Sequence, residues 1–143
     1  GEAVRQGRRK EFAAFDWDPE EIPDPQAGDT FLRSKLDWDE MSSRPHSDLL
    51  RWYRSLVALR RRFPGLTDGR IGKTGVNFDD TARWLTMTRG PVLVACNFAE
   101  SVQRIPCAGA AVKEILLSSR NGVIVEEAST LLPAGTVALF GIS

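Results

Sequence analysis

Acidic side chains near the start of this sequence are the groups whose types and spacing could do chemistry. They form two clusters, Asp16, Asp18, Glu20, Glu21 and Asp24, followed by Asp37, Asp39 and Glu40. Two carboxyl groups held roughly 5–10 Å apart across a sugar ring can cleave a glycosidic bond. The first cluster is broken by prolines, and no predicted strand precedes it to aim the side chains. We therefore interpret these carboxylates as solvated loop charge, with an active site at Asp16–Asp24 as the alternative.

Other catalytic and metal-binding patterns are weak. His46 is the only histidine, so a catalytic triad would have to form around it, yet the sequence contains no Gly-x-Ser-x-Gly pattern. We interpret His46 as a loop residue at a helix entry. One histidine and two separated cysteines lack the spacing of a zinc site, and the segment 69–75 lacks that of a phosphate loop. We expect no catalytic residue, no metal and no cofactor in this chain.

Two tryptophans in irregular segments could bind sugar. An exposed Trp17 or Trp38 could stack its flat ring on a pyranose. The interpretation we favour is that each anchors its loop against a neighbouring domain, because aromatic side chains dominate such buried contacts. Trp52 and Trp84 lie in predicted regular elements, where we expect them to pack.

Composition excludes several classes of partner. Of the 143 residues, 42% are hydrophobic and 27% charged, and nineteen basic residues balance nineteen acidic ones. No net field favours nucleic acid or an anionic membrane, and no apolar run approaches the roughly 20 residues of a membrane span. A hairpin of residues 92–98 and 102–106 would place Cys96 opposite Arg104, so we expect no disulfide with Cys107 and a cytoplasmic location.

The elements that must position these residues fall into two parts. We predict a helix over 2–15, a Pro-rich loop from Asp16 to Met41, and a strong amphipathic helix over 48–63 that begins at an N-cap Ser47 and ends at Pro64-Gly65. We expect the large apolar side chains of the loop to be buried; they are Trp17, Ile22, Phe31, Leu36 and Trp38. The apolar face of the second helix comprises Leu49, Leu50, Tyr53, Leu56, Val57 and Phe63.

Beyond residue 66 the spacing of apolar residues changes from the helical repeat to every second residue, as in β-strands. We predict strands at 74–78, 82–88, 92–98, 102–106, 112–118, 123–127 and 136–142. In the third strand, Val92, Val94, Cys96 and Phe98 share one apolar face, which is the pattern of a half-buried strand. Short strands with frequent turns predict an antiparallel β-sandwich, and we place the domain boundary at residue 66. We further expect Phe78, Trp84, Phe98 and Phe140 to face the core.

Several runs carry a resemblance to a known family. They are Arg5-Gln6-Gly7-Arg8-Arg9-Lys10-Glu11-Phe12, Trp17-Asp18-Pro19-Glu20-Glu21-Ile22-Pro23-Asp24-Pro25-Gln26 and Phe31-Leu32-Arg33-Ser34-Lys35-Leu36-Asp37-Trp38. They resemble the C-terminal third of malto-oligosyltrehalose trehalohydrolases, in the α-amylase superfamily. The run Leu49-Leu50-Arg51-Trp52-Tyr53-Arg54 is similar to the last barrel helix of that superfamily. The runs Ala82-Arg83-Trp84-Leu85 and Val94-Ala95-Cys96-Asn97-Phe98 are similar to strands of the sandwich that follows it.

The resemblance implies a mainly β fold. Residues 1–66 would be the last helical portion of a (β/α)8 barrel, and residues 67–143 a C-terminal antiparallel β-sandwich. The parent would hydrolyse the α-1,4 bond beside the trehalose unit of maltooligosyl trehalose. Its catalytic carboxylates would lie on upstream barrel strands, so this chain would be inert and would complete the barrel. Arg9, Phe12 and Trp17 are the candidates for touching sugar, because they lie nearest the barrel face where such active sites are found.

Two alternatives remain open. The chain could be the equivalent part of a glycogen branching or debranching enzyme, or a free-standing carbohydrate-binding module. We also expect the apolar face of helix 48–63 to be exposed, or to be buried by self-association, when the chain is separated from the barrel.

Overall fold

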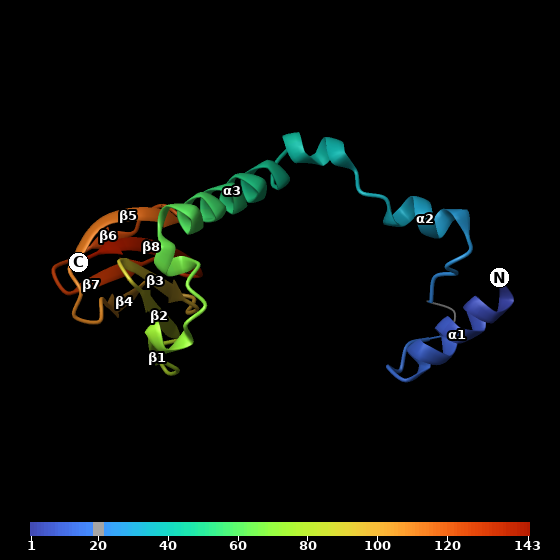
Figure 1. Ribbon diagram of the computed structural model, residues 1–143, viewed down its shortest axis with the longest axis horizontal. Coiled ribbons are helices and arrows are strands. Elements are labelled where there is room, and N and C mark those ends of the chain that lie inside the picture. The colour runs from blue at the N-terminus through green and yellow to red at the C-terminus, as the bar shows by residue number, and fades with distance from the viewer. Residues whose placement is uncertain (19–21) are drawn as a thin grey trace. The chain divides into compact units, whose positions relative to one another are not determined.

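The computed structural model describes residues 1–18 and 22–143 and divides the chain into two compact units, Gly1–Arg44 and Pro45–Ser143 (Figure 1). The second unit holds the long helix together with all described strands. The boundary that we predict at residue 66 lies inside this second unit. The position of the boundary between the barrel and the sandwich therefore stays a prediction.

The first unit is built from short helices. Helix α1 (Glu2–Ala13) ends two residues before the predicted position, and Asp16 then takes the left-handed backbone conformation with φ 59°. The predicted loop contains α2 (Gly28–Ser34) and the 3-10 helix η1 (Trp38–Ser42). At the start of η1 the Asp37 carboxylate accepts a hydrogen bond from the Asp39 backbone N–H at 3.0 Å, which satisfies one of the donors that a helix start leaves open.

Large apolar side chains of this unit are mostly exposed within the chain, and their burial against a neighbouring domain stays a prediction. The exposed fractions are 51% for Trp17, 66% for Phe31, 68% for Leu36 and 66% for Trp38, whereas Ile22 is half-buried. Short helices separated by prolines present no continuous layer against which these side chains can pack.

Helix α3 (His46–Arg62) confirms the strongest helical pattern of the sequence. It begins directly after Pro45, so Ser47 lies in its first turn and the predicted N-cap is wrong. Phe63 turns extended, and a 3-10 helix, η2 (Pro64–Leu66), follows, because proline lacks the donor that would continue the α-helix. Leu59 is buried, but Leu49, Tyr53 and Val57 remain exposed.

Eight strands follow η2 and the short 3-10 helix η3 (Ile71–Lys73). They are β1 (Thr74–Asp79), β2 (Trp84–Arg89), β3 (Val92–Asn97), β4 (Gln103–Pro106), β5 (Val112–Ser118), β6 (Ile124–Val125), β7 (Ser129–Leu132) and β8 (Thr136–Ile142). One sheet has the order β1-β2-β3-β8-β5 and the other β4-β7-β6, with every pairing antiparallel. The predicted antiparallel β fold is confirmed, and β7 is the strand that the sequence pattern missed.

The hairpin predicted between residues 92–98 and 102–106 does not form. Strand β3 pairs with β2 and β8, whereas β4 pairs with β7 in the other sheet. The chain crosses between the sheets after β3, so Cys96 lies opposite Leu85 and Val137 and not opposite Arg104. Cys96 and Cys107 are both free thiols.

The core lies between the two sheets. Its fully buried members are Leu93, Ala95, Ile105, Cys107, Leu132, Ala138 and Phe140, and Trp84 packs against them. The core-facing side of β3 is therefore that of Leu93 and Ala95, opposite to the face predicted from the alternation. Both faces of β3 carry apolar residues, so period two alone does not distinguish them. Phe140 faces the core as expected, but Phe78 and Phe98 are exposed by 63% and 59%.

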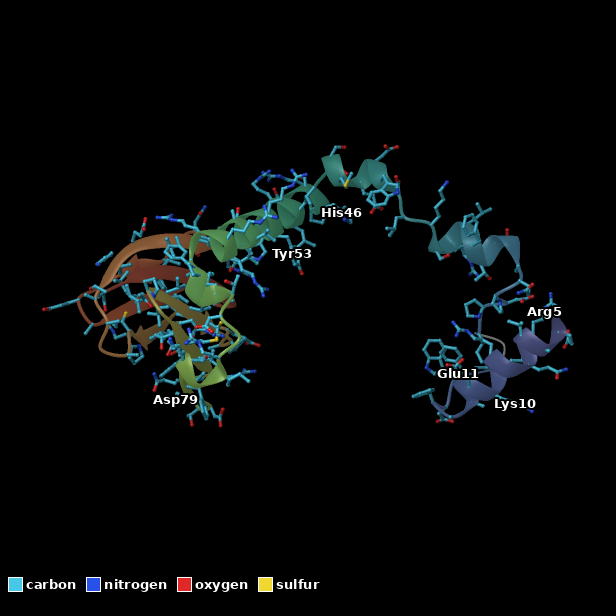
Figure 2. The ribbon with its side chains drawn as sticks, viewed as in Figure 1. Arg5, Lys10, Glu11, His46, Tyr53 and Asp79 are labelled. Atoms are coloured by element: carbon cyan, nitrogen blue, oxygen red, sulfur yellow. The ribbon has the colours of Figure 1, made fainter. Side chains whose placement is uncertain are left out.

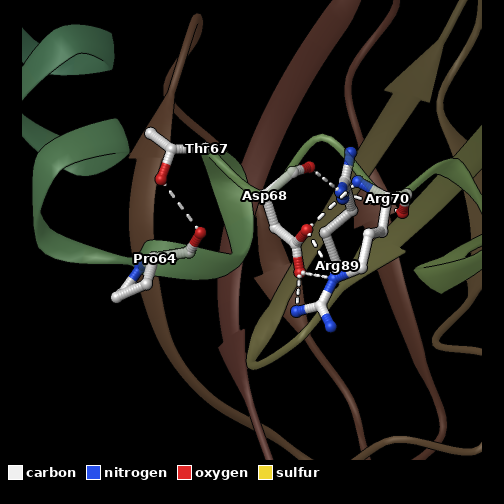
Figure 3. Close-up of polar contacts among 5 residues, drawn as sticks. All are labelled: Pro64, Thr67, Asp68, Arg70 and Arg89. Carbon is white, nitrogen blue, oxygen red and sulfur yellow. Dashed lines mark hydrogen bonds and ion pairs between the residues drawn. The ribbon is translucent and has the colours of Figure 1, made fainter.

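Arg89, the last residue of β2, ties the segment after η2 to the β2–β3 turn, and an ion pair within that segment holds its shape (Figure 3). The Arg70 guanidinium donates to the Asp68 carboxylate at 2.6 and 2.8 Å, and these bonds lower the pKa of Asp68 to about 2. Arg89 donates to the backbone carbonyls of Asp68 and Arg70. A Cβ added at Gly65 would lie 3.2 Å from the Arg89 carbonyl oxygen, so glycine permits the close approach of η2 to this turn.

The Asn97 side chain joins the two sheets. This residue ends β3 and is only 2% exposed. Its Nδ2 donates to the carbonyls of Ser101, Leu132 and Pro133 at 2.8–2.9 Å, and its Oδ1 accepts from the Ala99 N–H at 2.9 Å. Leu132 ends β7 of the second sheet. One amide therefore satisfies buried groups on both layers.

We expect Asn97→Ala to lower the free energy of unfolding by about 2 kcal/mol or more, because it leaves buried carbonyls unpaired. The matched control is Asn77→Ala, at an exposed asparagine of β1, which we expect to change stability by about 0.5 kcal/mol or less. Urea denaturation followed by circular dichroism measures both. Equal midpoints for the two variants would contradict the role assigned to Asn97.

Candidate functional site

A pocket of about 250 Å³ lies in the first unit between the Pro-rich segment and α1, the helix that carries Arg5 in Figure 2. Its lining residues are Arg5, Arg8, Arg9, Ile22, Pro23, Asp24 and Pro25. Three of the seven carry a guanidinium group. The pocket is therefore rich in hydrogen-bond donors that keep their charge at any ordinary pH.

Helical spacing and one ion pair position these side chains. Arg5, Arg8 and Arg9 stand at i, i+3 and i+4 of α1, which places them on one side of the helix. The Arg5 Nε lies 2.6 Å from a carboxylate oxygen of Asp24, and the other carboxylate oxygen of Asp24 accepts from the Gln26 N–H at 2.9 Å. Asp24 thus holds the proline segment against α1 and closes the pocket.

An aromatic cluster adjoins the arginines. The Arg8 guanidinium carbon lies 5.0 Å from the ring centroid of Phe12, within range of a cation–π contact. The Phe12 and Trp17 rings are tilted by 40° with centroids 5.1 Å apart. Arg8 also lies 3.4 Å from a carboxylate oxygen of Glu11. Arg8 is therefore the residue that connects the pocket to the aromatic pair.

The three residues predicted to touch sugar lie in the pocket or in the aromatic pair beside it. Arg9 lines the pocket, while Phe12 and Trp17 form the aromatic pair beside it. The sequence analysis did not single out Arg8, which lines the pocket and contacts the Phe12 ring. The signal that could have found it is the i, i+4 spacing of Arg8 and Phe12.

The pocket can bind but lacks the groups for hydrolysis among its described lining residues. Asp24 is their single carboxylate, and it is paired with Arg5, whereas glycosidic cleavage uses two. In the predicted acidic cluster, Asp16 and Asp18 are exposed, and Glu20 and Glu21 lie outside the described residues. Donor groups beside an exposed aromatic face suit recognition of a polar ring compound.

The remaining candidates do not assemble into a site. His46 is the exposed first residue of α3. Over residues 1–18 and 22–143, no group of three His, Cys, Asp or Glu side chains is arranged to hold a metal ion. No described helix is both long and apolar enough to cross a membrane.

Comparison with known proteins identifies similar sequences, although no family model matches. The chain is 42% identical to a malto-oligosyltrehalose trehalohydrolase of Rhizobium sp. strain M-11 and 41% identical to one of Brevibacterium helvolum. Each match covers 97% of this chain and 23% of the relative. A Mycobacterium tuberculosis protein of the same name is 38% identical over 93% of the chain. The chain therefore spans about a quarter of the length of these relatives.

Solved structures agree in fold. A putative α-amylase from Salmonella typhimurium superimposes with a TM-score of 0.70 at 26% identity, over 98% of this chain and 23% of that one. A trehalulose synthase from Pseudomonas mesoacidophila superimposes over 65% of the chain with a TM-score of 0.54 at 20% identity, which shows a shared fold alone. The sequence and structural matches agree with the resemblance of the motifs: over 97% of its length the chain is similar to malto-oligosyltrehalose trehalohydrolases, and it corresponds to 23% of their length.

Proposed function

We propose that this chain is the C-terminal part of a glycoside hydrolase that cleaves the α-1,4 bond beside the trehalose unit of maltooligosyl trehalose and releases trehalose. The observation that carries the proposal is the 42% identity to a trehalohydrolase across 97% of the chain. The parent would act in trehalose biosynthesis in the cytoplasm. Its catalytic carboxylates would lie outside this chain.

The role of the chain itself is then structural. Residues 1–66 would form the end of the catalytic barrel, and residues 67–143 the sandwich that follows it. The exposed apolar residues Leu49, Tyr53 and Val57 stand at i, i+4 and i+8 of α3. Such a stripe requires a covering partner, and the remainder of the parent barrel would provide it.

Arg9, Phe12 and Trp17 would contribute to the rim of the active site. The pocket beside them offers guanidinium donors to sugar hydroxyl groups, and the Trp17 ring is 51% exposed and able to stack on a pyranose. This pocket would act in binding and orientation, since the described lining residues include a single carboxylate.

The first test measures trehalose release from maltooligosyl trehalose by this chain and by its full-length parent. We expect activity in the parent alone, because the chain lacks a pair of suitably held carboxylates. Activity in the 143-residue chain would contradict our proposal that the chain is catalytically inactive and would favour an active site at Asp16–Asp24. Inactivity of both proteins would contradict the proposed substrate.

Substitutions at the rim test the binding role in the parent. We expect Trp17→Ala or Arg9→Ala to raise KM for maltooligosyl trehalose on the order of tenfold with little change in kcat, because the lost contacts act on bound substrate and transition state alike. Lys10→Ala is the control, since Lys10 neighbours Arg9 on α1 but does not line the pocket. An unchanged KM in the Trp17 and Arg9 variants would remove these residues from the site.

Sedimentation equilibrium tests the covering role of α3. We expect the isolated chain to self-associate with rising concentration through the stripe of Leu49, Tyr53 and Val57, and Tyr53→Glu with Val57→Glu to leave it monomeric. Ala58→Glu introduces the same charge at an exposed position on another side of the helix and should leave association unchanged. A monomeric wild-type chain at all concentrations would contradict the prediction.

A further inference from the structure

A second pocket lies in the sandwich unit, at the end where β1 turns into β2. Its volume is about 310 Å³, and it is lined by Phe78, Asp79, Asp80, Arg83, Trp84, Leu85 and Phe98. Figure 2 shows Asp79 at the end of this unit that lies away from α3. The pocket is therefore separate from the helix stripe that we assign to the barrel contact.

Two exposed phenylalanines line the pocket beside the five-stranded sheet. Phe78 pairs with Leu85 across β1 and β2. Phe98 follows β3, and its backbone N–H donates to the Arg83 carbonyl at 2.8 Å. Both rings point away from the core, with exposed fractions of 63% and 59%. This outcome is the reverse of the core-facing positions predicted from the sequence.

The turn between β1 and β2 holds the polar groups of the pocket in a defined geometry. The Asp79 carboxylate accepts a hydrogen bond from the Ala82 N–H at 2.8 Å, which fixes the loop. Arg83 adopts a left-handed backbone with φ 58°, a conformation uncommon for a residue with a side chain. Asp80 and Arg83 therefore line the pocket from a constrained turn and not from a long loop.

The chemistry of the pocket fits a neutral sugar. Flat aromatic rings complement the apolar C–H faces of a pyranose, while carboxylate acceptors and a guanidinium donor complement its hydroxyl groups. Two carboxylates against one guanidinium leave the lining with a formal charge of minus one, which disfavours phosphate and other anions. Polar groups that converge between apolar side chains are typical of small-molecule sites.

We propose that this pocket is a glucan-binding site on the β-sandwich, built by Phe78, Phe98 and the Asp80–Arg83 turn. The choice of an α-1,4-glucan as the ligand rests on the proposed function, whereas the assignment of a sugar site rests on the pocket alone. The site would hold an α-1,4-linked glucan segment of the kind that maltooligosyl trehalose contains.

Titration calorimetry of the 143-residue chain with maltoheptaose tests the proposal, with cellohexaose as the β-linked comparison. We expect maltoheptaose to bind, and Phe78→Ala and Phe98→Ala each to raise Kd by about three- to tenfold, the range for loss of one aromatic contact. Asp80→Asn should weaken binding in the same direction without disturbing the apolar surface. Circular dichroism confirms that each variant is folded.

Phe31→Ala is the matched control, because Phe31 is 66% exposed, as Phe78 is, but lies in the other unit. Absence of maltoheptaose binding, or equal loss in the control, would overturn the site. Binding of cellohexaose alone would overturn the α-glucan assignment. Trehalose release by the parent is measured separately, so failure of the proposed function and failure of this site give different results.

Discussion

The sandwich depends on one buried amide. Two sheets that share no hydrogen-bonded strand must be held in register by side chains, and apolar contacts are not directional. Asn97 supplies direction, because its Nδ2 reaches the Leu132 carbonyl of β7 and the Pro133 carbonyl that leads to β8, while its Oδ1 holds the Ala99 N–H. A buried polar group of this kind is favourable only when all its partners are present. The hydrogen bonds of Asn97, together with apolar packing, therefore fix where the chain leaves the first sheet at the end of β3.

The sandwich unit has two exposed apolar surfaces, one on α3 and one around Phe78 and Phe98, and they suit different partners. The stripe on α3 is a regular row of aliphatic and aromatic side chains, as expected for a helix that packs along its length on another layer. The surface around Phe78 and Phe98 is instead mixed with Asp80 and Arg83 at a constrained turn. A flat apolar stripe suits a protein partner, and a pocket of mixed polarity suits a small polar ligand. The same sandwich unit thus presents a packing surface and a binding surface.

Regular elements with strong patterns could be predicted from the sequence. The strands at 112–118 and 136–142 have the predicted bounds, and the long helix differs by two residues at its start and one at its end. Strand β7 was missed because it has four residues directly before Pro133, too short for alternation to be visible. The buried face of β3 was assigned to the wrong side because both of its faces are apolar.

Site residues were harder to predict than elements. Arg9, Phe12 and Trp17 were chosen through the resemblance, and the structure places them in or beside one pocket. The pocket itself requires the contact between Arg5 and Asp24, which are far apart in the sequence. Such a contact is fixed by tertiary geometry and leaves no periodic signal. The pairing of Phe78 with Leu85 likewise emerges only from strand register.

Strand order has a consequence for the synthesis of the protein. Strand β8 lies between β3 and β5, so residues 136–142 fill an interior position of the larger sheet (Figure 1). Until a ribosome has released that segment, β3 and β5 have no neighbour on their inner edges, and Leu93 and Ala95 have no Phe140 to pack against. Unpaired strand edges favour association with other chains. While residues 136–142 are still inside the ribosome, the nascent chain is therefore prone to associate with other chains.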